Sequence, residues 1–244
     1  MSRLTSPDQI EAVLFDAVGT LIRPARSISE TYAEIGRRHD VDLPEDEINA
    51  RFRKAFARQE QLDTSAEGGR TSEPREVERW RTIVGEVFDH PGSLEPLFAE
   101  LWDYFTDPAA WTVDPSVAKV VRRIRDSGRK VGVASNFDHR LRSIAHAVPE
   151  LQDCPLFISS EVGWRKPREE FYRSIEAELS LPASRLLMVG DDLVNDYQGA
   201  TQAGWQAIFL HRHDRGKAAT AVDGEATVEP CVDALEQTLA LLEL

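Results

Sequence analysis

Short apolar runs alternate with amphipathic stretches near the start of the chain and throughout its second half. One run spans residues 11–15 and ends at Asp16, and the others lie at 130–135, 156–159, 186–189 and 207–210. Apolar runs of this length are typical of strands that are buried on both faces of a sheet. The pattern therefore predicts five buried strands.

The stretches between these runs have the period of a helix. In the segment 115–127, apolar residues recur at helical spacing, Asp114 is a candidate N-cap and Gly128 follows the last turn. Further helices are expected at 168–180, 193–203 and 233–242. Strands that alternate with helices predict an α/β fold, with a parallel sheet covered by helices on both faces.

The middle of the chain has a different pattern, because no strand is evident between about residues 27 and 111. Helices are expected at 29–38, 44–61, 74–88 and 93–105, with a polar loop over 63–72. An insertion of roughly 85 to 90 residues is large enough to form a small domain of its own. We therefore expect a core made of residues 1–23 and 112–244, and an α-helical cap made of residues 24–111.

The aromatic residues of this insertion, including Trp80, Trp102 and Phe105, also follow the helical spacing. Side chains at this spacing are typical of one buried helix face. We expect most of them to form the core of the cap rather than a binding site for substrate.

Composition and charge exclude several classes of protein. The 244 residues include 29 Lys and Arg against 42 Asp and Glu, for a formal net charge of -13, so nucleic acid is not expected as a partner. No stretch approaches the roughly 18 to 20 apolar residues that span a bilayer, and the first ten residues contain no apolar signal region. We expect a cytoplasmic protein without a membrane partner.

The two cysteines, Cys154 and Cys231, lie far apart and lack the spacing of a zinc site. We expect both of them to be small buried hydrophobic residues.

Polar side chains capable of chemistry follow the predicted strands. They are Asp16 and Thr20 after the first run, Ser135 and Asn136 after the second, Lys166 beyond the third, and Asp191, Asp192 and Asp196 after the fourth. Because ligands bind at the carboxyl ends of parallel strands, these groups are expected to meet at one edge of the sheet. Carboxylates, a lysine and hydroxyl groups would suit Mg²⁺ together with a phosphate group.

Four segments resemble, in order, the motifs of the haloacid dehalogenase-like hydrolase superfamily. They are Phe15-Asp16-Ala17-Val18-Gly19-Thr20-Leu21, Ser135-Asn136, Lys166-Pro167, and Gly190-Asp191-Asp192 with Asn195-Asp196. The resemblance spans nearly the whole chain and implies a Rossmann-like core with a helical cap inserted after the first motif. Ser135-Asn136-Phe137-Asp138 and Asp196-Tyr197-Gln198-Gly199 also resemble the group called haloacid dehalogenase-like hydrolase domain-containing protein 3.

The resemblance also implies a role for each motif residue in substrate turnover. Asp16 would be the nucleophile that forms a covalent aspartyl intermediate. Thr20 and Ser135 would hold the transferring group with the help of Asn136, and Lys166 would orient Asp16 and neutralise the intermediate.

For the metal, the resemblance implies a Mg²⁺ site with several ligands. Asp16 and Asp191 would bind the ion directly, Asp192 and Asp196 would support them, and the backbone carbonyl of Val18 would be the remaining protein ligand. The substrate expected at such a site is a small phosphorylated molecule.

Val18 departs from the phosphatase pattern, which places a second Asp at this position as the general acid and base. Loss of a positioned acid typically costs 10²- to 10⁴-fold in rate, or about 3 to 5 kcal/mol of barrier. Acyl and aryl phosphates, whose leaving groups need little protonation, would be affected less than unactivated phosphate monoesters.

Three alternatives to a phosphatase follow from this departure. The 2-haloacid dehalogenases lack the acid, but the acidic segment Gly190-Asp191-Asp192 would place needless negative charge beside a substrate carboxylate. The phosphonatases also lack it and use a cap lysine; the only lysine of this insertion, Lys54, lies off the apolar stripe of its helix and is expected to be solvated. The third alternative is a catalytically weakened phosphate-binding or interaction module that keeps the fold.

Overall fold

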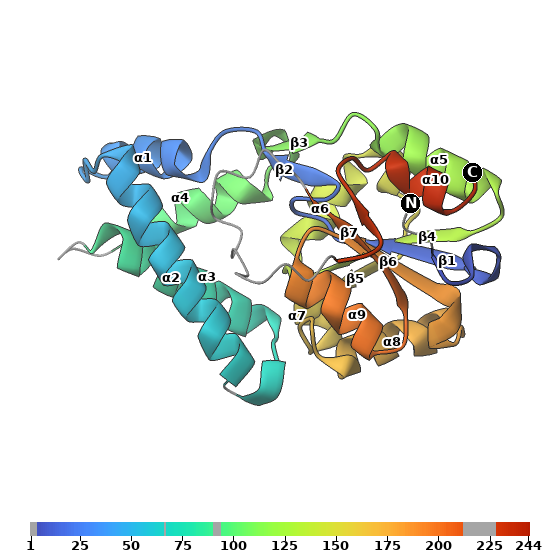
Figure 1. Ribbon diagram of the computed structural model, residues 1–244. Helices are drawn as coiled ribbons and strands as arrows, with labels where there is room; N and C mark the ends of the chain where they lie inside the picture. The colour runs from blue at the N-terminus through green and yellow to red at the C-terminus, as the bar shows by residue number, and fades with distance from the viewer. Residues whose placement is uncertain (1–3, 66, 90–93, 212–227) are drawn as a thin grey trace.

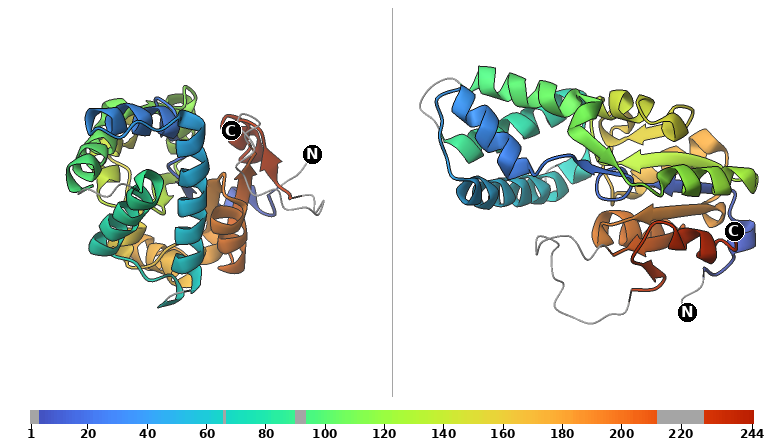
Figure 2. Two further views of the ribbon diagram at one scale, coloured as in Figure 1. Left: turned by 90° about the vertical axis from the view of Figure 1, so that its left-hand side faces the viewer. Right: turned by 90° about the horizontal axis from the view of Figure 1, so that it is seen from above.

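The computed structural model describes residues 4–65, 67–89, 94–211 and 228–244. Within these residues the protein has two parts, a helical unit and an α/β core, joined at one side (Figure 1, Figure 2). The core contains a parallel sheet with the strand order β5-β4-β1-β6-β7-β8. Its strands are β1 (Ala12–Phe15), β4 (Lys130–Ser135), β5 (Leu156–Ile158), β6 (Leu186–Gly190), β7 (Gln206–Leu210) and β8 (Cys231–Val232).

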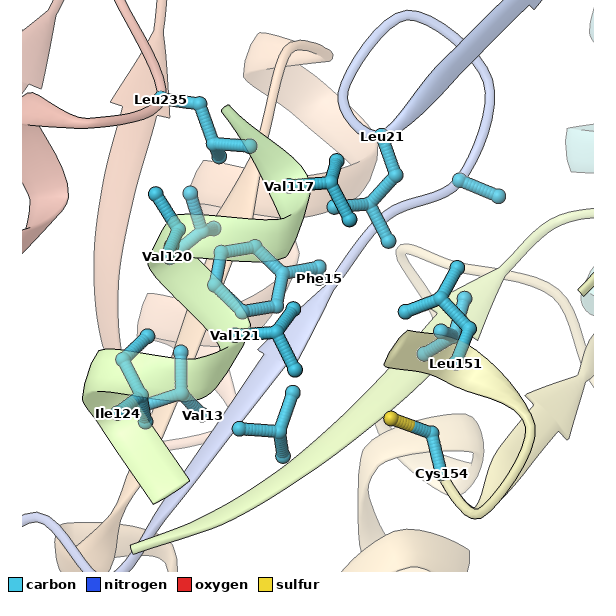
Figure 3. Packing of buried hydrophobic residues seen from close by; sticks show 14 of the residues in the cluster. Val13, Phe15, Leu21, Val117, Val120, Val121, Ile124, Leu151, Cys154 and Leu235 are labelled. Atoms are coloured by element: carbon cyan, nitrogen blue, oxygen red, sulfur yellow. The ribbon is translucent and has the colours of Figure 1, made fainter. Parts of the chain in front are cut away.

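Helices cover both faces of this sheet, as the apolar runs predict. Val13 and Phe15 of β1 pack on one face, against α5 and its neighbours, whereas Ala12 and Leu14 pack on the other. Figure 3 shows Phe15 among the valines and the isoleucine of α5. The first face is covered by α5 (Val117–Asp126), α6 (Arg140–His146) and α10 (Gln237–Leu241), and the second by α8 (Glu169–Leu179) and α9 (Gly199–Gln202).

The predicted strands are confirmed, but the structure differs from the expectation in several places. Ser159 begins the short helix α7 (Ser159–Val162) rather than ending β5. Residues 193–203 form a π-helical turn, Leu193–Gln198, that continues into α9. Cys154 is buried as expected, but the expectation for Cys231 is wrong, because this residue is exposed on the unpredicted strand β8.

The inserted segment forms a helical unit with its own apolar core. Its helices are α1 (Ile28–Arg38), α2 (Glu45–Ser65), α3 (Glu73–Phe88) and α4 (Glu95–Thr106). The buried side chains that join them include Tyr32, Ile48, Ile83 and Leu101, and this cluster is separate from those of the sheet. Hydroxyl caps set two of the helix starts, because Ser27 accepts the backbone N–H of Glu30 and Ser72 that of Arg75.

The stretch 63–72, predicted to be a polar loop, is partly helical and partly buried. Helix α2 extends into this stretch as far as Ser65, and the side chains of Asp63 and Thr71 are buried. Ser93, at which the fourth cap helix was expected to begin, lies outside the described residues. In the described part of the chain, no helix is both long and apolar enough to cross a membrane.

A short antiparallel ribbon connects the two parts. Strand β2 (Ile22–Pro24) pairs with β3 (Trp111–Val113), so that Arg23 lies opposite Thr112. Figure 1 shows this ribbon between the cap helices and the sheet. Both boundaries expected for the cap, at residues 23/24 and 111/112, fall within the ribbon, which means that the two connections leave the core side by side.

We expect the substitution Ile124→Ala to lower the free energy of unfolding by about 2 to 5 kcal/mol, because Ile124 is fully buried between α5 and the sheet. Urea denaturation measures this change. Arg123→Ala, at an exposed position of the same helix, serves as the control and is expected to change stability by less than about 1 kcal/mol. Equal effects of the two substitutions would contradict the packing described for α5.

Candidate active site

Three neighbouring strands deliver polar side chains to the same edge of the sheet. Strand β1 lies between β4 and β6, and Phe15 is in register with Val133 of β4 and Val189 of β6. Ser135, the last residue of β4, and Asp16 and Asp191, which directly follow β1 and β6, are therefore brought together. Because the three strands are parallel, these side chains all lie at the carboxyl ends.

Asp16 and Lys166 form a buried ion pair at this edge. The Lys166 ammonium donates hydrogen bonds to Oδ1 of Asp16 at 2.9 Å, to Oδ1 of Asp196 at 2.5 Å and to the carbonyl oxygen of Ala134 at 2.7 Å. The hydroxyl of Ser135 donates to the same Oδ1 of Asp16 at 3.0 Å. Both side-chain donors thus bind Oδ1 of Asp16, and neither of them binds Oδ2.

Burial and charge act against one another at this lysine. Burial lowers the pKa of Lys166, but the carboxylates of Asp16 and Asp196 outweigh this effect, so the pKa lies above its usual value. Burial also raises the pKa of Asp196 to about 7, although the Lys166 charge acts to lower it. The lysine is therefore protonated at neutral pH and offsets part of the negative charge at the site.

One carboxylate oxygen from each of Asp16, Asp191 and Asp196 lies within 4.8 Å of the other two. The hydroxyl of Thr20 donates to Oδ1 of Asp191 at 3.0 Å, which orients that carboxylate. Such a set of oxygen donors fits a small, hard divalent cation such as Mg²⁺. Since both oxygens of Asp196 already accept hydrogen bonds, from Lys166 and from the backbone of Asp192, Asp16 and Asp191 are better placed as direct ligands.

Asn136 and Asp192, two further residues expected at the site, make contacts that position their neighbours. The Asn136 amide accepts the backbone N–H of Lys166 at 2.8 Å and donates to the carbonyl oxygen of Lys166 at 2.9 Å. Asp192 caps the π-helical turn by accepting the backbone N–H groups of Val194 and Asn195. Asn136 therefore holds the lysine-bearing loop, and Asp192 fixes the turn that carries Asp196.

Gly190 leaves room for the carboxylate of Asp196. A Cβ atom at residue 190 would lie 2.2 Å from Oδ2 of Asp196, which is closer than such atoms pack. Gly199 has a comparable role, because a Cβ atom there would lie 2.8 Å from the Pro167 side chain. Gly190 thus lets Asp196 approach the end of β6, and Gly199 lets the helix after Asp196 approach the Lys166-Pro167 loop.

The cap is anchored to the core through Arg165, the residue before the lysine of the site. Arg165 donates from Nη1 to Glu76 of α3 at 2.6 Å and from Nη2 to Glu60 of α2 at 3.0 Å. Arg79 of α3 contacts Glu60 and also donates to Asp63 at 2.8 Å. The sequence pattern did not reveal this cluster, because its members are far apart in the chain and include part of the expected polar loop.

Backbone contacts reinforce this anchor between the cap and the core. The N–H of Thr71 donates to the carbonyl of Gly163 at 3.1 Å, and the N–H of Arg165 donates to the carbonyl of Gly69 at 2.9 Å. Glu73 accepts hydrogen bonds from the backbone and ring nitrogens of His139 in the core, the latter at 2.5 Å. The end of the cap near α3 is therefore held closely against the site.

A cavity of about 350 Å³ lies between the sheet edge and the cap. Asp16, Ser135, Lys166 and Asp191 line its core end, while Thr20 is buried and is not part of the lining. The cap end is lined mainly by aromatic side chains, among them Phe52, Phe56, Trp80, Phe105 and Trp111. Trp80 and Phe105 thus contribute both to the cap core, as expected, and to the cavity wall, which was not expected.

Val18 lines the cavity close to the sheet edge and offers no side chain that can transfer a proton. Lys54, the lysine of the insertion, is exposed on α2 and is not among the lining residues. The expectation that Lys54 is solvated is therefore confirmed. Its position gives no support to a phosphonatase-like Schiff base.

A family model of haloacid dehalogenase-like hydrolases matches residues 10–204, which include all four motifs. The chain belongs to the haloacid dehalogenase-like hydrolases. The comparison thus confirms the membership implied by the motif residues, and the geometry above shows how this hydrolase brings them together.

Relatives of this haloacid dehalogenase-like hydrolase include proteins with different names. Haloacid dehalogenase-like hydrolase domain-containing protein 3 of Danio rerio is 28% identical over 211 residues, covering 84% of this chain and 86% of that protein. Ribulose-1,5-bisphosphate 5-phosphatase of Halopiger xanaduensis is 25% identical over 225 residues, covering 88% and 91%. The solved L-2-haloacid dehalogenase RSc1362 has the same fold, with a TM-score of 0.68, 18% identity and coverage of 96% and 99%.

We expect Gly190→Ala to lower the free energy of unfolding of this hydrolase by about 1 to 3 kcal/mol, because the added methyl group must displace the carboxylate of Asp196. Urea denaturation provides the measurement. The control is Gly85→Ala in α3, where a Cβ atom meets nothing within 4 Å, and the substitution should leave stability unchanged or raise it by up to about 1 kcal/mol. A Gly190→Ala protein as stable as the control would contradict the close approach.

Proposed function

We propose that this protein is a magnesium-dependent phosphatase that acts on a small phosphorylated metabolite through a phosphorylated form of Asp16. The observation that carries the proposal is the cluster of Asp16, Asp191 and Asp196 with the Lys166 ammonium at one end of the cavity between the sheet edge and the cap. A relative named as a sugar bisphosphate phosphatase supports the same reaction class.

The reaction has two steps at Asp16. First, a carboxylate oxygen of Asp16 attacks the phosphorus atom, a new oxygen–phosphorus bond forms, and the bond to the leaving oxygen breaks. Water then attacks the phosphorus of the acyl phosphate, which releases inorganic phosphate and restores the Asp16 carboxylate. Lys166 and Ser135, which hold Oδ1 of Asp16, keep the nucleophile oriented in both steps.

Asp16 and Asp191 would hold Mg²⁺ together with the backbone carbonyl of Val18, and Asp192 and Asp196 would support them. When bound, the ion supplies positive charge that offsets the repulsion between phosphate and the site carboxylates. That repulsion is substantial, since two unit charges 4 Å apart cost about 4 kcal/mol at an effective dielectric constant of 20. Thr20 acts through its hydrogen bond to Asp191, and Asn136 acts by positioning Lys166.

Val18 limits the leaving groups that this site handles well. The leaving oxygen must depart as an anion or take its proton from water, because residue 18 cannot supply one. Acyl and aryl phosphates meet this condition, whereas alkyl phosphate monoesters react slowly.

The arrangement is less suited to the two rival functions. A 2-haloacid dehalogenase would have to place a substrate carboxylate beside the carboxylates of Asp16, Asp191 and Asp196, whose negative charge would repel it. The likeness to the solved dehalogenase shows the fold alone. A binding module would not require the nucleophile to be held by both Lys166 and Ser135.

Hydrolysis of acetyl phosphate and p-nitrophenyl phosphate, with and without Mg²⁺, tests the proposal. We expect turnover of both substrates that depends on Mg²⁺ and falls by at least about a thousandfold in Asp16→Asn, because the amide is not a nucleophile. Asp103→Asn, at an exposed position of α4, is the matched control and should leave turnover unchanged.

Two outcomes would overturn the assignment. Failure of both phosphates together with chloride release from 2-chloropropionate would identify a dehalogenase. Failure of all three substrates in the folded protein would favour the binding module.

We further expect Val18→Asp to raise turnover of p-nitrophenyl phosphate and of alkyl monoesters by at least about tenfold, because a positioned acid contributes about 10²- to 10⁴-fold. Steady-state kinetics measure the effect, with Val18→Asn as an isosteric control that cannot donate a carboxyl proton. An unchanged rate in a folded Val18→Asp protein would show that residue 18 does not limit the reaction.

A further inference from the structure

We infer that the cap end of the cavity binds a flat, aromatic organic group, so that the substrate is an aryl monophosphate rather than a sugar bisphosphate. This inference rests on the proposed phosphatase function and specifies its substrate class. Two observations carry it. The cap end of the cavity has an aromatic wall, and the charged side chains that the described lining places beside this wall are already engaged in ion pairs.

The aromatic wall is continuous. On the side of α2 and α3, the rings of Phe52 and Phe56 lie 5.8 Å apart, and that of Trp80 is 6.2 Å from Phe56. Tyr32 joins this row to the opposite one, with ring distances of 5.6 Å to Phe52 and 6.4 Å to Phe105. Aromatic faces of this kind bind flat apolar groups through stacked and edge-on contacts.

On the opposite side the row continues toward the core. The rings of Phe105 and Trp111 are 6.0 Å apart, and Trp111 is 5.9 Å from Phe137, which follows β4 near Ser135. All of these residues line the same cavity as Asp16. The wall therefore runs from the cap down to the sheet edge at which the phosphate would bind.

The arginines of the described lining are already neutralised. Arg140 makes two bonds to Asp138, at 2.7 and 2.6 Å, and its guanidinium lies over the ring of Trp102. Arg165 and Arg79 are bound to the cap carboxylates, Arg165 to Glu76 at 2.6 Å. A second phosphate in the cap end would have to displace a carboxylate from one of these buried ion pairs, and that makes a bisphosphate a poor fit.

The size of the cavity and the chemistry at residue 18 agree with this substrate class. A volume of about 350 Å³ is at the lower end of the range for small-molecule sites and accommodates one or two fused rings with a phosphate group. An aryl oxygen leaves without full protonation, so the valine that replaces the acid costs such a substrate least. The two observations are independent, because one concerns the size of the cavity and the other concerns residue 18 in the first motif of the core.

The first test measures binding, which does not depend on turnover. We expect the full chain with Mg²⁺ to bind 1-naphthylphosphonate at least about tenfold more tightly than methylphosphonate in calorimetry, since a buried aromatic contact of about 1.4 kcal/mol changes Kd tenfold. Trp80→Leu and Phe56→Leu should each reduce this preference to less than about threefold. Tyr104→Leu, which changes a half-buried cap ring outside the lining, should leave it unchanged.

The second test compares substrates. With 1-naphthyl phosphate, Trp80→Leu and Phe56→Leu should raise KM by about tenfold and lower kcat/KM at least about fivefold more than they lower kcat/KM for acetyl phosphate. Ribulose-1,5-bisphosphate should be hydrolysed at least about tenfold less efficiently than 1-naphthyl phosphate. A purely structural role for the rings would lower activity toward acetyl phosphate equally.

The outcomes separate this inference from the proposed function. Hydrolysis of acetyl phosphate without a preference for the naphthyl ligands, or with a preference for the bisphosphate, would overturn the inference and leave the phosphatase proposal standing. Selective binding of 1-naphthylphosphonate by a protein that hydrolyses none of the phosphates would support the aromatic site and overturn the phosphatase proposal.

Discussion

The burial of the Lys166 ammonium between Asp16 and Asp196 is the interaction on which the rest of the site depends. Three charged side chains removed from water would be strongly destabilising if any of them lacked its partners. Here the lysine is held by two carboxylates and a backbone carbonyl, and its loop is held in turn by Asn136. Strand order, the glycine beside Asp196 and the capped turn at Asp192 all bring these charges to the required separation.

Much of this arrangement follows from the sequence, because strands buried on both faces leave a strong local signal. The runs ending at Asp16, Ser135 and Val189 identify neighbouring strands, and the polar residues at and after their ends meet at one edge in the structure. Strands β2 and β3 were missed because each has three residues, and β2 includes a proline. Nothing in so short a segment distinguishes a ribbon from a loop.

The cap shows why the remainder was not predictable. Phe52 and Phe56 are four residues apart on α2, and such spacing indicates a shared helix face without showing whether that face meets another helix or a cavity. Similarly, the polar residues of 63–72 suggest exposure, whereas Asp63 is buried because Arg79, which lies on the next helix, reaches it. The position of the two phenylalanines and the burial of Asp63 both depend on tertiary contacts, and such contacts leave no periodic pattern in the sequence.

Arg165 links the cap to the loop that carries Lys166. The cap joins the core through the ribbon β2–β3, so any displacement of the cap relative to the sheet would turn about these two adjacent connections. Such a motion would pull Glu60 and Glu76 away from Arg165, whose peptide neighbour is Lys166. With these ion pairs broken, the loop would lose part of the support that keeps the Lys166 ammonium against Asp16. The salt bridges that hold the cap against the core would thus also help to keep the nucleophile and its lysine in place.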